Sequence, residues 1–316
     1  MMKRYRSMIR RIMEVILTFF LVSIFSFILM RVSPVDPATA YARRAMVSPT
    51  PEQIQELRVE LGFDKPLVIQ YADWVHHALH LDFGKSLVTG RPALTELVQS
   101  VPLTIKVVLI AALIEAAGAI LAGCLLYLLP KAGRVIAGFL TLAAISIPGF
   151  YVASVYLELF ATRLHWISVV GNSGISRFIH PAVCLALAPM CFYARLIRNE
   201  LQKEEQEDYV FYERCRGLSE KRILFFHMLP HGLIALIPSF LQNIGLTIAG
   251  AAIIERVFSL PGLGYLIIDS VLNRDTPMIH LEVLFLALML VITNIVSDLA
   301  QDRLLKRNLT RGENAQ

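Results

Sequence analysis

Residues 107–128 read VVLIAALIEAAGAILAGCLLYL, a stretch of 22 residues in which Glu115 is the one charged side chain. A helix needs about 20 apolar residues to cross the roughly 30 Å of hydrocarbon in a bilayer. The stretch shows no alternation of apolar and polar residues, as a barrel strand would. Because lipid admits only helices and closed barrels, this stretch predicts a membrane-spanning α-helix.

Five more apolar blocks of comparable length lie before and after this stretch. The 316-residue chain is 56% hydrophobic and 17% charged, whereas soluble domains carry about 25% charged residues. We therefore predict an all-α membrane protein with about six transmembrane helices and a small extracytoplasmic subdomain between helices 1 and 2. The predicted spans are residues 12–30, 103–128, 135–161, 179–198, 233–254 and 279–300.

Basic residues set the predicted orientation. The N-terminal tail, the turn with Lys131 and Arg134, the 199–232 loop and the C-terminal tail are all basic. Positive charge marks the cytoplasmic side, so we expect a multi-pass membrane protein with both termini cytoplasmic. These residues lie at the ends of apolar blocks and form no stripe with aromatic residues. The net charge of +5 therefore does not indicate nucleic acid binding.

The first apolar block follows basic residues, as a signal peptide would. Its 19 residues, 12–30, exceed a typical signal core, and no small-residue cleavage site closes it. We therefore expect a retained first span. The expected organisation is a tail and first helix (1–30), an extracytoplasmic subdomain (31–101), a five-helix transmembrane core with a cytoplasmic loop at 199–232 (102–302) and a tail (303–316).

The 31–101 segment has its own helix signals. Thr50-Pro51-Glu52-Gln53 predicts a capped helix start, and Gly62 a helix end. Gly84-Lys85-Ser86 resembles the end of a phosphate-binding loop, but Leu79 stands where that loop needs a glycine. We expect no nucleotide site and no bound cofactor on this chain.

The loop 199–232 is long and highly charged, so it lies outside the membrane. Residues 209–216 predict a short helix that Gly217 ends, and Ser219 predicts the cap of a second helix toward Leu229-Pro230. Two interpretations stay open on these grounds. The loop is a rigid cytoplasmic knob, or it is an ordinary solvated connection.

The spacing from Gly217 to Leu229-Pro230 resembles the EAA loop of ATP-binding-cassette importer permeases. Phe211-Tyr212-Glu213 stands where E-A-A would, and His227 where Ile would. The dipeptide, oligopeptide and nickel permeases depart there as well, and their form is matched by Tyr209-Val210, Arg214 and Gly217-Leu218-Ser219.

Further matches to this family cover most of the chain. Lys106 departs from it, because the family commonly has Glu there, and any role of that Glu is in doubt here. The matching stretches are Asp36-Pro37, Leu61-Gly62-Phe63-Asp64-Lys65-Pro66-Leu67, Leu81-Asp82-Phe83-Gly84-Lys85-Ser86, Ser146-Ile147-Pro148 and Glu255-Arg256-Val257-Phe258-Ser259-Leu260-Pro261-Gly262-Leu263-Gly264.

The resemblance implies a type I importer permease fold and a transport subunit of the bacterial inner (plasma) membrane rather than an enzyme. It implies three kinds of partner besides the lipid bilayer: a second homologous permease, two ATPase subunits that hold ATP-Mg, and an extracytoplasmic substrate-binding protein. The short helix would insert into a groove on the ATPase, with Glu213 on the docking surface. The implied coupling residues are Tyr209, Phe211, Tyr212, Glu213, Arg214, Gly217, Leu218, Ser219, Leu229 and Pro230.

Polar residues inside the spans are candidates for the translocation path. They are Glu115, Gln242, Asn243 and Thr247. A charge at mid-bilayer costs about 2.5–3.5 kcal/mol, so such residues usually face a cavity or a partner helix. Pairing between helices is the alternative, for Glu115 with Lys106 or with a polar group on a neighbouring helix. Glycines such as Gly118 and Gly123 favour close helix contact.

Histidines and cysteines give weak metal signals. His76 and His80 lie at i and i+4 on one predicted helix face, but no third ligand can be identified. The four cysteines form no C-x-x-C pair, which argues against a zinc site. We expect no metal site. His76 and His80 are the only residues that the sequence offers as candidates for one.

The resemblance implies a substrate that is nickel (free or chelated) or a di- or oligopeptide. The short external loop 162–178 and the stretch 79–84 resemble the nickel-type members and tilt the prediction toward nickel. An ion-coupled secondary transporter is the alternative, and it should show internal repeats and paired midplane charges. A membrane-embedded enzyme would need His or Asp clusters in its spans.

Overall fold

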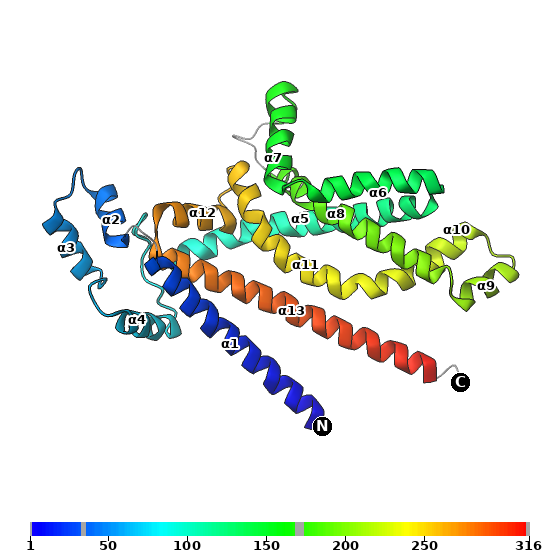
Figure 1. The fold of residues 1–316 in the computed structure, drawn as a ribbon, viewed down its shortest axis with the longest axis horizontal. Coiled ribbons are helices and arrows are strands. Elements are labelled where there is room, and N and C mark those ends of the chain that lie inside the picture. Colours follow the sequence, from blue (N-terminus) through cyan, green and yellow to red (C-terminus); the bar gives the residue numbers. More distant parts are fainter. Residues whose placement is uncertain (1, 33–35, 168–173, 314–316) are drawn as a thin grey trace. The chain divides into compact units, whose positions relative to one another are not determined.

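The computed structural model describes residues 2–32, 36–167 and 174–313, and within these ranges the chain forms helices and no sheet. Two compact units share them: residues 1–104 with 260–291, and residues 105–259 with 292–316. The helices, drawn in Figure 1, are α1 Met2–Val32, α2 Pro37–Ala45, α3 Pro51–Glu60, α4 Leu67–Leu79, α5 Ala93–Leu128, α6 Lys131–Ser146, α7 Gly149–Leu157, η1 Glu158–Arg163, α8 Ser176–Glu204, α9 Asp208–Cys215, α10 Glu220–Ile223, η2 Leu224–Met228, α11 Leu229–Val257, α12 Leu263–Asn273 and α13 Thr276–Glu313.

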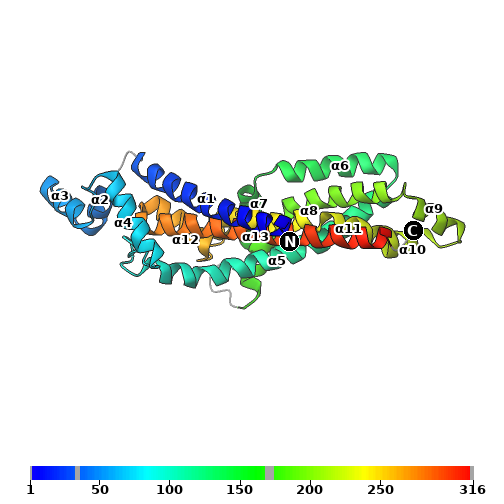
Figure 2. The ribbon, with the colours of Figure 1, turned by 90° about the horizontal axis from the view of Figure 1, so that it is seen from below.

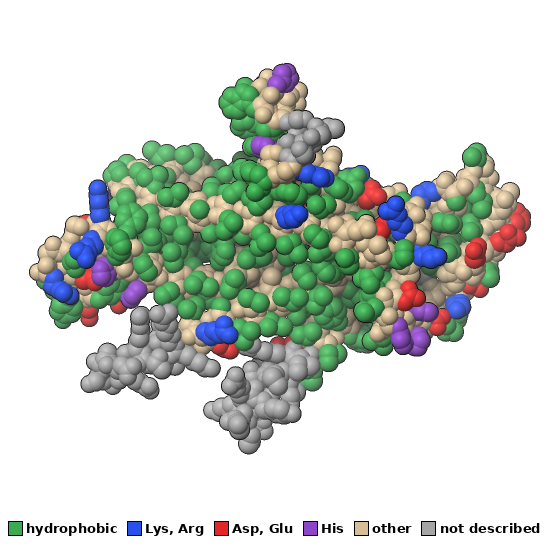
Figure 3. All heavy atoms as spheres, turned by 180° about the vertical axis from the view of Figure 1, so that it is seen from behind, with side chains coloured by type: hydrophobic (Ala, Val, Ile, Leu, Met, Phe, Trp, Pro, Cys, Tyr) green, Lys and Arg blue, Asp and Glu red, His purple; other side chains and the backbone are tan. Residues whose placement is uncertain are grey.

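Five helical segments are long and apolar enough to cross a membrane, and a bent pair supplies a sixth span if it counts as one. Their surfaces carry large exposed apolar side chains such as Leu113 and Leu121, at 72% and 73% exposure. Hydrophobic side chains cover much of the face drawn in Figure 3. Lipid is the environment that such surfaces require, so the prediction of an all-α membrane protein is confirmed.

The third span departs from its prediction. Residues 135–161 were expected to form one helix, but α6 and the segment α7–η1 meet at an angle of 93°. Pro148 disfavours helical backbone at the residue before it, and Ile147 is extended at φ −81° and ψ 125°. The span is broken at Ile147-Pro148, within the Ser146-Ile147-Pro148 motif.

Two further boundaries differ from the sequence expectation. Helix α5 begins at Ala93, ten residues before the predicted start at 103, and continues through Pro102. Helix α12 was not predicted, because its 11 residues are too few for a span. It ends at Arg274, which adopts the left-handed conformation at φ 54°.

In the first unit, capping fixes the short helices between α1 and α5. Thr50 and Gln53 form the predicted capping box at the start of α3, and Gly62 follows that helix at φ 70°. Buried Asp275 accepts hydrogen bonds from the Ser86 hydroxyl at 2.5 Å and the Leu87 N–H at 3.0 Å. This carboxylate anchors the loop before α5 to the start of α13. The core of the unit is formed by Ala93, Leu97, Leu263, Met278 and Leu281.

In the second unit, the part of α5 from Ile105 packs closely against α8. A Cβ at Gly123 would lie 2.8 Å from the Ile197 side chain, and one at Gly118 would collide with Met190. The prediction of close helix contact at these glycines is confirmed. Figure 2 shows α6 alongside α8, and α9 with α10 beyond the end of α8 and the beginning of α11.

The described residues include only part of the predicted external loop 162–178. Residues 168–173 of the external loop 162–178 lie outside them. The described parts of the predicted 31–101 subdomain belong to the first unit, and the loop 199–232 to the second.

Candidate coupling site

Helix α9 is a two-turn helix with a well-defined end. Gly217 stands at φ 79°, its N–H donates to Arg214 O at 3.0 Å, and the Leu218 N–H donates to Glu213 O at 3.2 Å. These two bonds are the Schellman pattern, which needs a residue in the left-handed conformation. The predicted helix and the predicted stop at Gly217 are both confirmed.

Helix α10 begins after Ser219, as predicted, but the Ser219 side chain makes no capping hydrogen bond. The chain continues through the π-helical turn η2 into α11, where Leu229 and Pro230 are the first residues. Pro230 lacks the N–H of a regular helix, and the wider turn lies directly before it. The loop 199–232 is therefore folded almost throughout.

Apolar residues on the inner side anchor the α9–α10 pair, which we call the knob (residues 208–223). Val210 and Ile223 are fully buried and pack in one core with Ile197 and Leu201 of α8. Burying an aliphatic side chain contributes about 1.5–3 kcal/mol. The knob is therefore fixed to α8 rather than solvated on all sides.

Arg214 ties the knob together electrostatically. Its Nε donates to Glu220 Oε1 at 2.8 Å, one terminal nitrogen donates to Glu220 Oε2 at 3.1 Å, and the same nitrogen reaches Glu205 Oε1 at 3.4 Å. The hydrogen bond to Glu220 is the main cause of a raised Arg214 pKa. One guanidinium thus links the end of α8 to both knob helices.

Glu213 and His227 contact each other, with 2.6 Å between Oε1 and Nδ1. Glu213 is the last of the three residues that stand where E-A-A would, and His227 stands where the I-x-L-P pattern has Ile. The Glu213 side chain is only 14% exposed, so it faces inward and not onto the docking surface as the sequence suggested. Its second oxygen is buried and meets no partner among the described residues.

Tyr209 forms the third polar contact of the knob. Its hydroxyl donates to Glu204 Oε2 at 2.5 Å, and its ring lies 5.3 Å from that of His231. Burial, together with this hydrogen bond, raises the pKa of Tyr209. The phenol therefore stays protonated and keeps donating throughout the physiological range.

The outer side of the knob is aromatic. Phe211 and Tyr212 are 65% and 66% exposed, with ring centroids 6.1 Å apart. The helix thus buries Val210 inward and presents two neighbouring aromatic side chains outward. Leu218 and Leu229 are half-buried against the core, so they support the knob instead of extending its outer face.

The predicted intramembrane residues separate into two groups. Buried Glu115 of α5 accepts from Asn243 Nδ2 at 3.0 Å, and Asn243 Nδ2 lies 3.4 Å from Thr247 Oγ1 on the same helix, α11. Glu115 is therefore paired with a neighbouring helix, whereas Lys106 lies over the Phe178 ring at 5.5 Å. Gln242 is exposed and instead borders a hollow of about 320 Å³ between α11 and α13.

His76 and His80 lie side by side with ring centroids 4.8 Å apart, and His80 Nδ1 is 2.8 Å from the His76 carbonyl oxygen. Across the part of the chain that the structure describes, no three His, Cys, Asp or Glu side chains are grouped to hold a metal ion. The pair has no third ligand in the described chain.

Comparison with known proteins decides the family. The model of the binding-protein-dependent transport system inner membrane component matches residues 93–309, and the model of its N-terminal part matches residues 2–108. The chain belongs to this permease family. The prediction drawn from the sequence motifs is confirmed, and the permease is a subunit of an ATP-binding-cassette importer, not an enzyme.

Named relatives of the permease cover nearly its whole length. It is 30% identical over 300 residues to the "Putative peptide transport system permease protein" of Brucella suis biovar 1 (strain 1330), covering 92% of this chain and 95% of the relative. It is 32% identical over 299 residues to the nickel import system permease protein NikB of Staphylococcus aureus (strain bovine RF122 / ET3-1), covering 93% and 89%.

Family membership fixes the general setting of the permease. It is a multi-pass inner-membrane protein that works with ATPase and binding-protein partners. The alternative of an ion-coupled secondary transporter receives no support.

Proposed function

We propose that the knob is the element through which a partner ATPase drives this permease. The observation that carries the proposal is the pair Phe211 and Tyr212, exposed on a helix whose opposite face is anchored by Val210. Adjacent exposed aromatic side chains on a water-facing helix mark a protein interaction site. The two rings fill a groove on the ATPase, and its movement on ATP binding displaces α9.

Displacement of α9 reaches the spans through three contacts. Val210 packs on α8, Arg214 holds α10, and Glu213 holds His227 at the entry to α11. A knob fixed to two spans in this way moves them together. This is what alternating access needs from a coupling element.

The test removes the outer rings and leaves the anchor. Phe211→Ser with Tyr212→Ser is expected to keep membrane abundance, lose ATPase recovery in a pull-down and lose uptake. Cys215→Ser, exposed on the same helix, is the matched control and should change none of the three. Full ATPase recovery by the double variant would reject the docking face.

We also propose roles for the intramembrane set. Glu115, Asn243 and Thr247 brace the two helices that border the translocation path. Gln242, exposed toward the hollow beside α13, is the member of the set that lines the path. Gln242→Trp should therefore block uptake without lowering ATPase recovery.

The assembly and its orientation follow from the knob. The permease pairs with a second homologous permease, and two ATPases holding ATP-Mg dock from the cytoplasm, so the chain alone binds no ATP. Both termini are then cytoplasmic, and the 31–101 subdomain faces the binding protein outside. A cysteine replacing exposed Glu56 should react with an impermeant maleimide from the outside, whereas native Cys215, exposed on α9, should react only after permeabilisation. The reverse pattern would overturn the orientation.

The proposed substrate is nickel, free or chelated, with di- or oligopeptides as the other class. Relatives named for nickel import and for peptide transport support both, and the short 162–178 loop favours nickel. ATP hydrolysis by the reconstituted importer should rise with the loaded binding protein for one class only. The class that stimulates hydrolysis identifies the substrate.

A further inference from the structure

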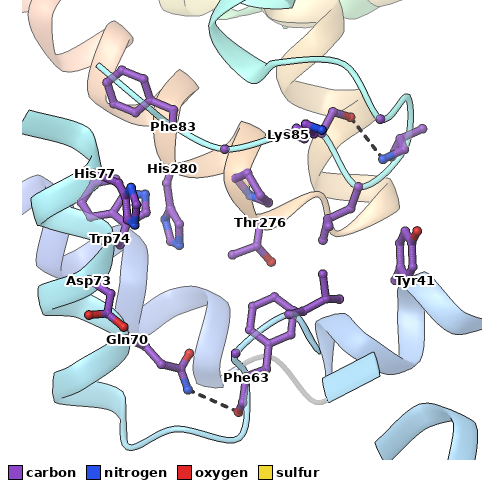
Figure 4. A pocket seen from close by; sticks show the side chains of 18 of the residues that line it. Tyr41, Phe63, Gln70, Asp73, Trp74, His77, Phe83, Lys85, Thr276 and His280 are labelled. Atoms are coloured by element: carbon purple, nitrogen blue, oxygen red, sulfur yellow. Dashed lines mark hydrogen bonds between the residues drawn. The ribbon is translucent and has the colours of Figure 1, made fainter. Parts of the chain in front are cut away.

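The first unit contains a cavity of about 860 Å³ that lies apart from the knob and from the intramembrane polar residues. Its walls come from α1, α2, α4, the loop before α5 and the first turns of α13. Cavities of about 300–1,000 Å³ are the size of small-molecule sites. Figure 4 shows Thr276 and His280 on one side of the opening and Phe63 with Gln70 across from them.

Two hydrogen-bonding groups in the wall have no partner among the described residues. Trp74 Nε1 and Thr276 Oγ1 are both buried and unpaired, and Thr276 as a whole is only 7% exposed. A buried donor left without an acceptor destabilises the folded chain. The indole N–H can only donate, so a ligand that satisfies it must bring an acceptor.

The charged side chains that line the cavity carry an excess of positive charge. Asp73 is paired with Lys65 at 3.0 Å, and Asp82 lies 3.4 Å from His77. Lys85 has no ion pair or hydrogen bond to its ammonium within the described chain, and the Arg44 guanidinium bonds only a carbonyl, that of Asn273. Both carboxylates are thus engaged while two cations are not. An anionic ligand is favoured.

The remaining wall is aromatic. Tyr41, Phe63, Trp74 and Phe83 line the cavity, and the Trp74 and His280 rings lie 5.3 Å apart. Aromatic faces bind apolar groups, and a small number of placed polar groups then fix the orientation of the ligand. The lining therefore combines an apolar body with donors and cations.

We propose that this cavity binds a small amphipathic carboxylate, with an apolar group against the aromatic wall and its carboxylate toward Lys85. Trp74 and Thr276 donate to the acceptors of the ligand. The residues of this site differ from those of the coupling element. The proposal can therefore be tested independently of the function proposed for the knob.

The chain offers a direct probe, because it has two tryptophans, Trp74 and Trp166. Trp166→Phe in the full purified chain makes Trp74 the sole tryptophan. The ligands used are N-acetyl-phenylalanine, which is an anion, and its C-terminal amide, which differ in the carboxylate alone. N-acetyl-phenylalanine is expected to change the Trp74 emission saturably and to bind at least tenfold more tightly than the amide.

Three variants in this background assign the contacts. Lys85→Met should reduce the affinity for the acid to that for the amide and leave the amide unchanged. Thr276→Val should weaken both several-fold. Lys131→Met, an exposed lysine on α6, is the matched control and should change neither. Thermal unfolding of each variant checks that it is folded.

The outcomes separate cleanly. No saturable change with either ligand, or equal affinity for acid and amide, overturns the proposal. An acid preference that survives Lys85→Met places the carboxylate elsewhere and overturns it too. Partition of the ligand into detergent would favour the amide, the opposite of the expected order.

Discussion

The knob and the Glu115–Asn243 contact are both polar connections between helices, but they lie in different solvents. Arg214 and its carboxylate partners are 36–69% exposed, so water and salt weaken each ion pair to about 0–1 kcal/mol. Glu115 is 1% exposed in an apolar helix, where no water can replace a lost partner. A polar contact therefore has a different energetic weight in the two places.

The difference teaches what each connection is for. In the knob, burial of Val210 and Ile223 holds the fold, and the charges orient α9 relative to α8 and α10. In the spans, packing against lipid-like surfaces gives little specificity, and one hydrogen bond fixes how α5 meets α11. The knob should tolerate loss of a charge but not of its apolar anchor.

The largest effect is expected from a substitution that disrupts this apolar anchor. Val210→Asp places a carboxylate at a fully buried position and should destabilise the knob by more than about 4 kcal/mol, because water does not reach the charge there. ATPase recovery and uptake should both disappear. Gln206→Asp puts the same charge at an exposed position just before α9, away from the aromatic face, and is the matched control. If Val210→Asp retains ATPase recovery, the apolar anchor is not what holds the knob.

A smaller effect is expected in the spans. Asn243→Leu leaves the Glu115 carboxylate without its amide partner and should lower the free energy of unfolding by about 1–3 kcal/mol. Glu115→Leu combined with Asn243→Leu should recover part of this loss, because no polar group remains unpaired. Thermal unfolding of the parent, of the two single variants Asn243→Leu and Glu115→Leu, and of the double variant in lipid gives the coupling energy, expected to be about 0.6–1.7 kcal/mol. Strictly additive effects would contradict the bracing role.

Sequence reasoning located the elements whose causes are local. The Thr50 capping box, the Gly217 stop and the apolar spans depend on residues within a few positions of each other, and all three are present. The bend at Pro148 was also local. It was missed because the apolar composition on both sides of the proline looked like one span.

Contacts between distant residues could not be predicted in this way. Ser86 was recognised within a motif, but its partner Asp275 lies 189 positions away. Glu213 was placed on the docking surface, because nothing in the sequence shows that His227 turns it inward. The sequence did contain one usable signal: Glu213 and His227 both lie where it departs from the family pattern, and they contact each other. Two unusual residues in one motif are candidates for a compensating pair.

A further prediction concerns the backbone of the knob. No atom outside its chain neighbours lies within 4 Å of a Cβ added at Gly217, so a substitution there acts through φ alone. Gly217→Val should strain α9 by about 1–2 kcal/mol, tilting it and lowering ATPase recovery and uptake. Gly217→Asn tolerates the left-handed region and should stay close to the parent. Equal loss in both variants would mean that the side chain, not φ, disturbs docking.

The smallest effect is expected where the contacts are most numerous. Arg214→Ala removes the hydrogen bonds to Glu220 and Glu205, yet each partner is exposed and can be hydrated instead. The free energy of unfolding should fall by less than about 1 kcal/mol, and less still at high salt. ATPase recovery should fall only slightly, since Val210 still seats α9 on α8. Glu220→Ala keeps the contact between Arg214 and Glu205 and should have a smaller effect, and the double variant should lose no more than Arg214→Ala, which already removes the Arg214–Glu220 pair. A loss as large as that of Val210→Asp would show that charge, and not burial, positions the knob, and the contrast between the two regions would fail.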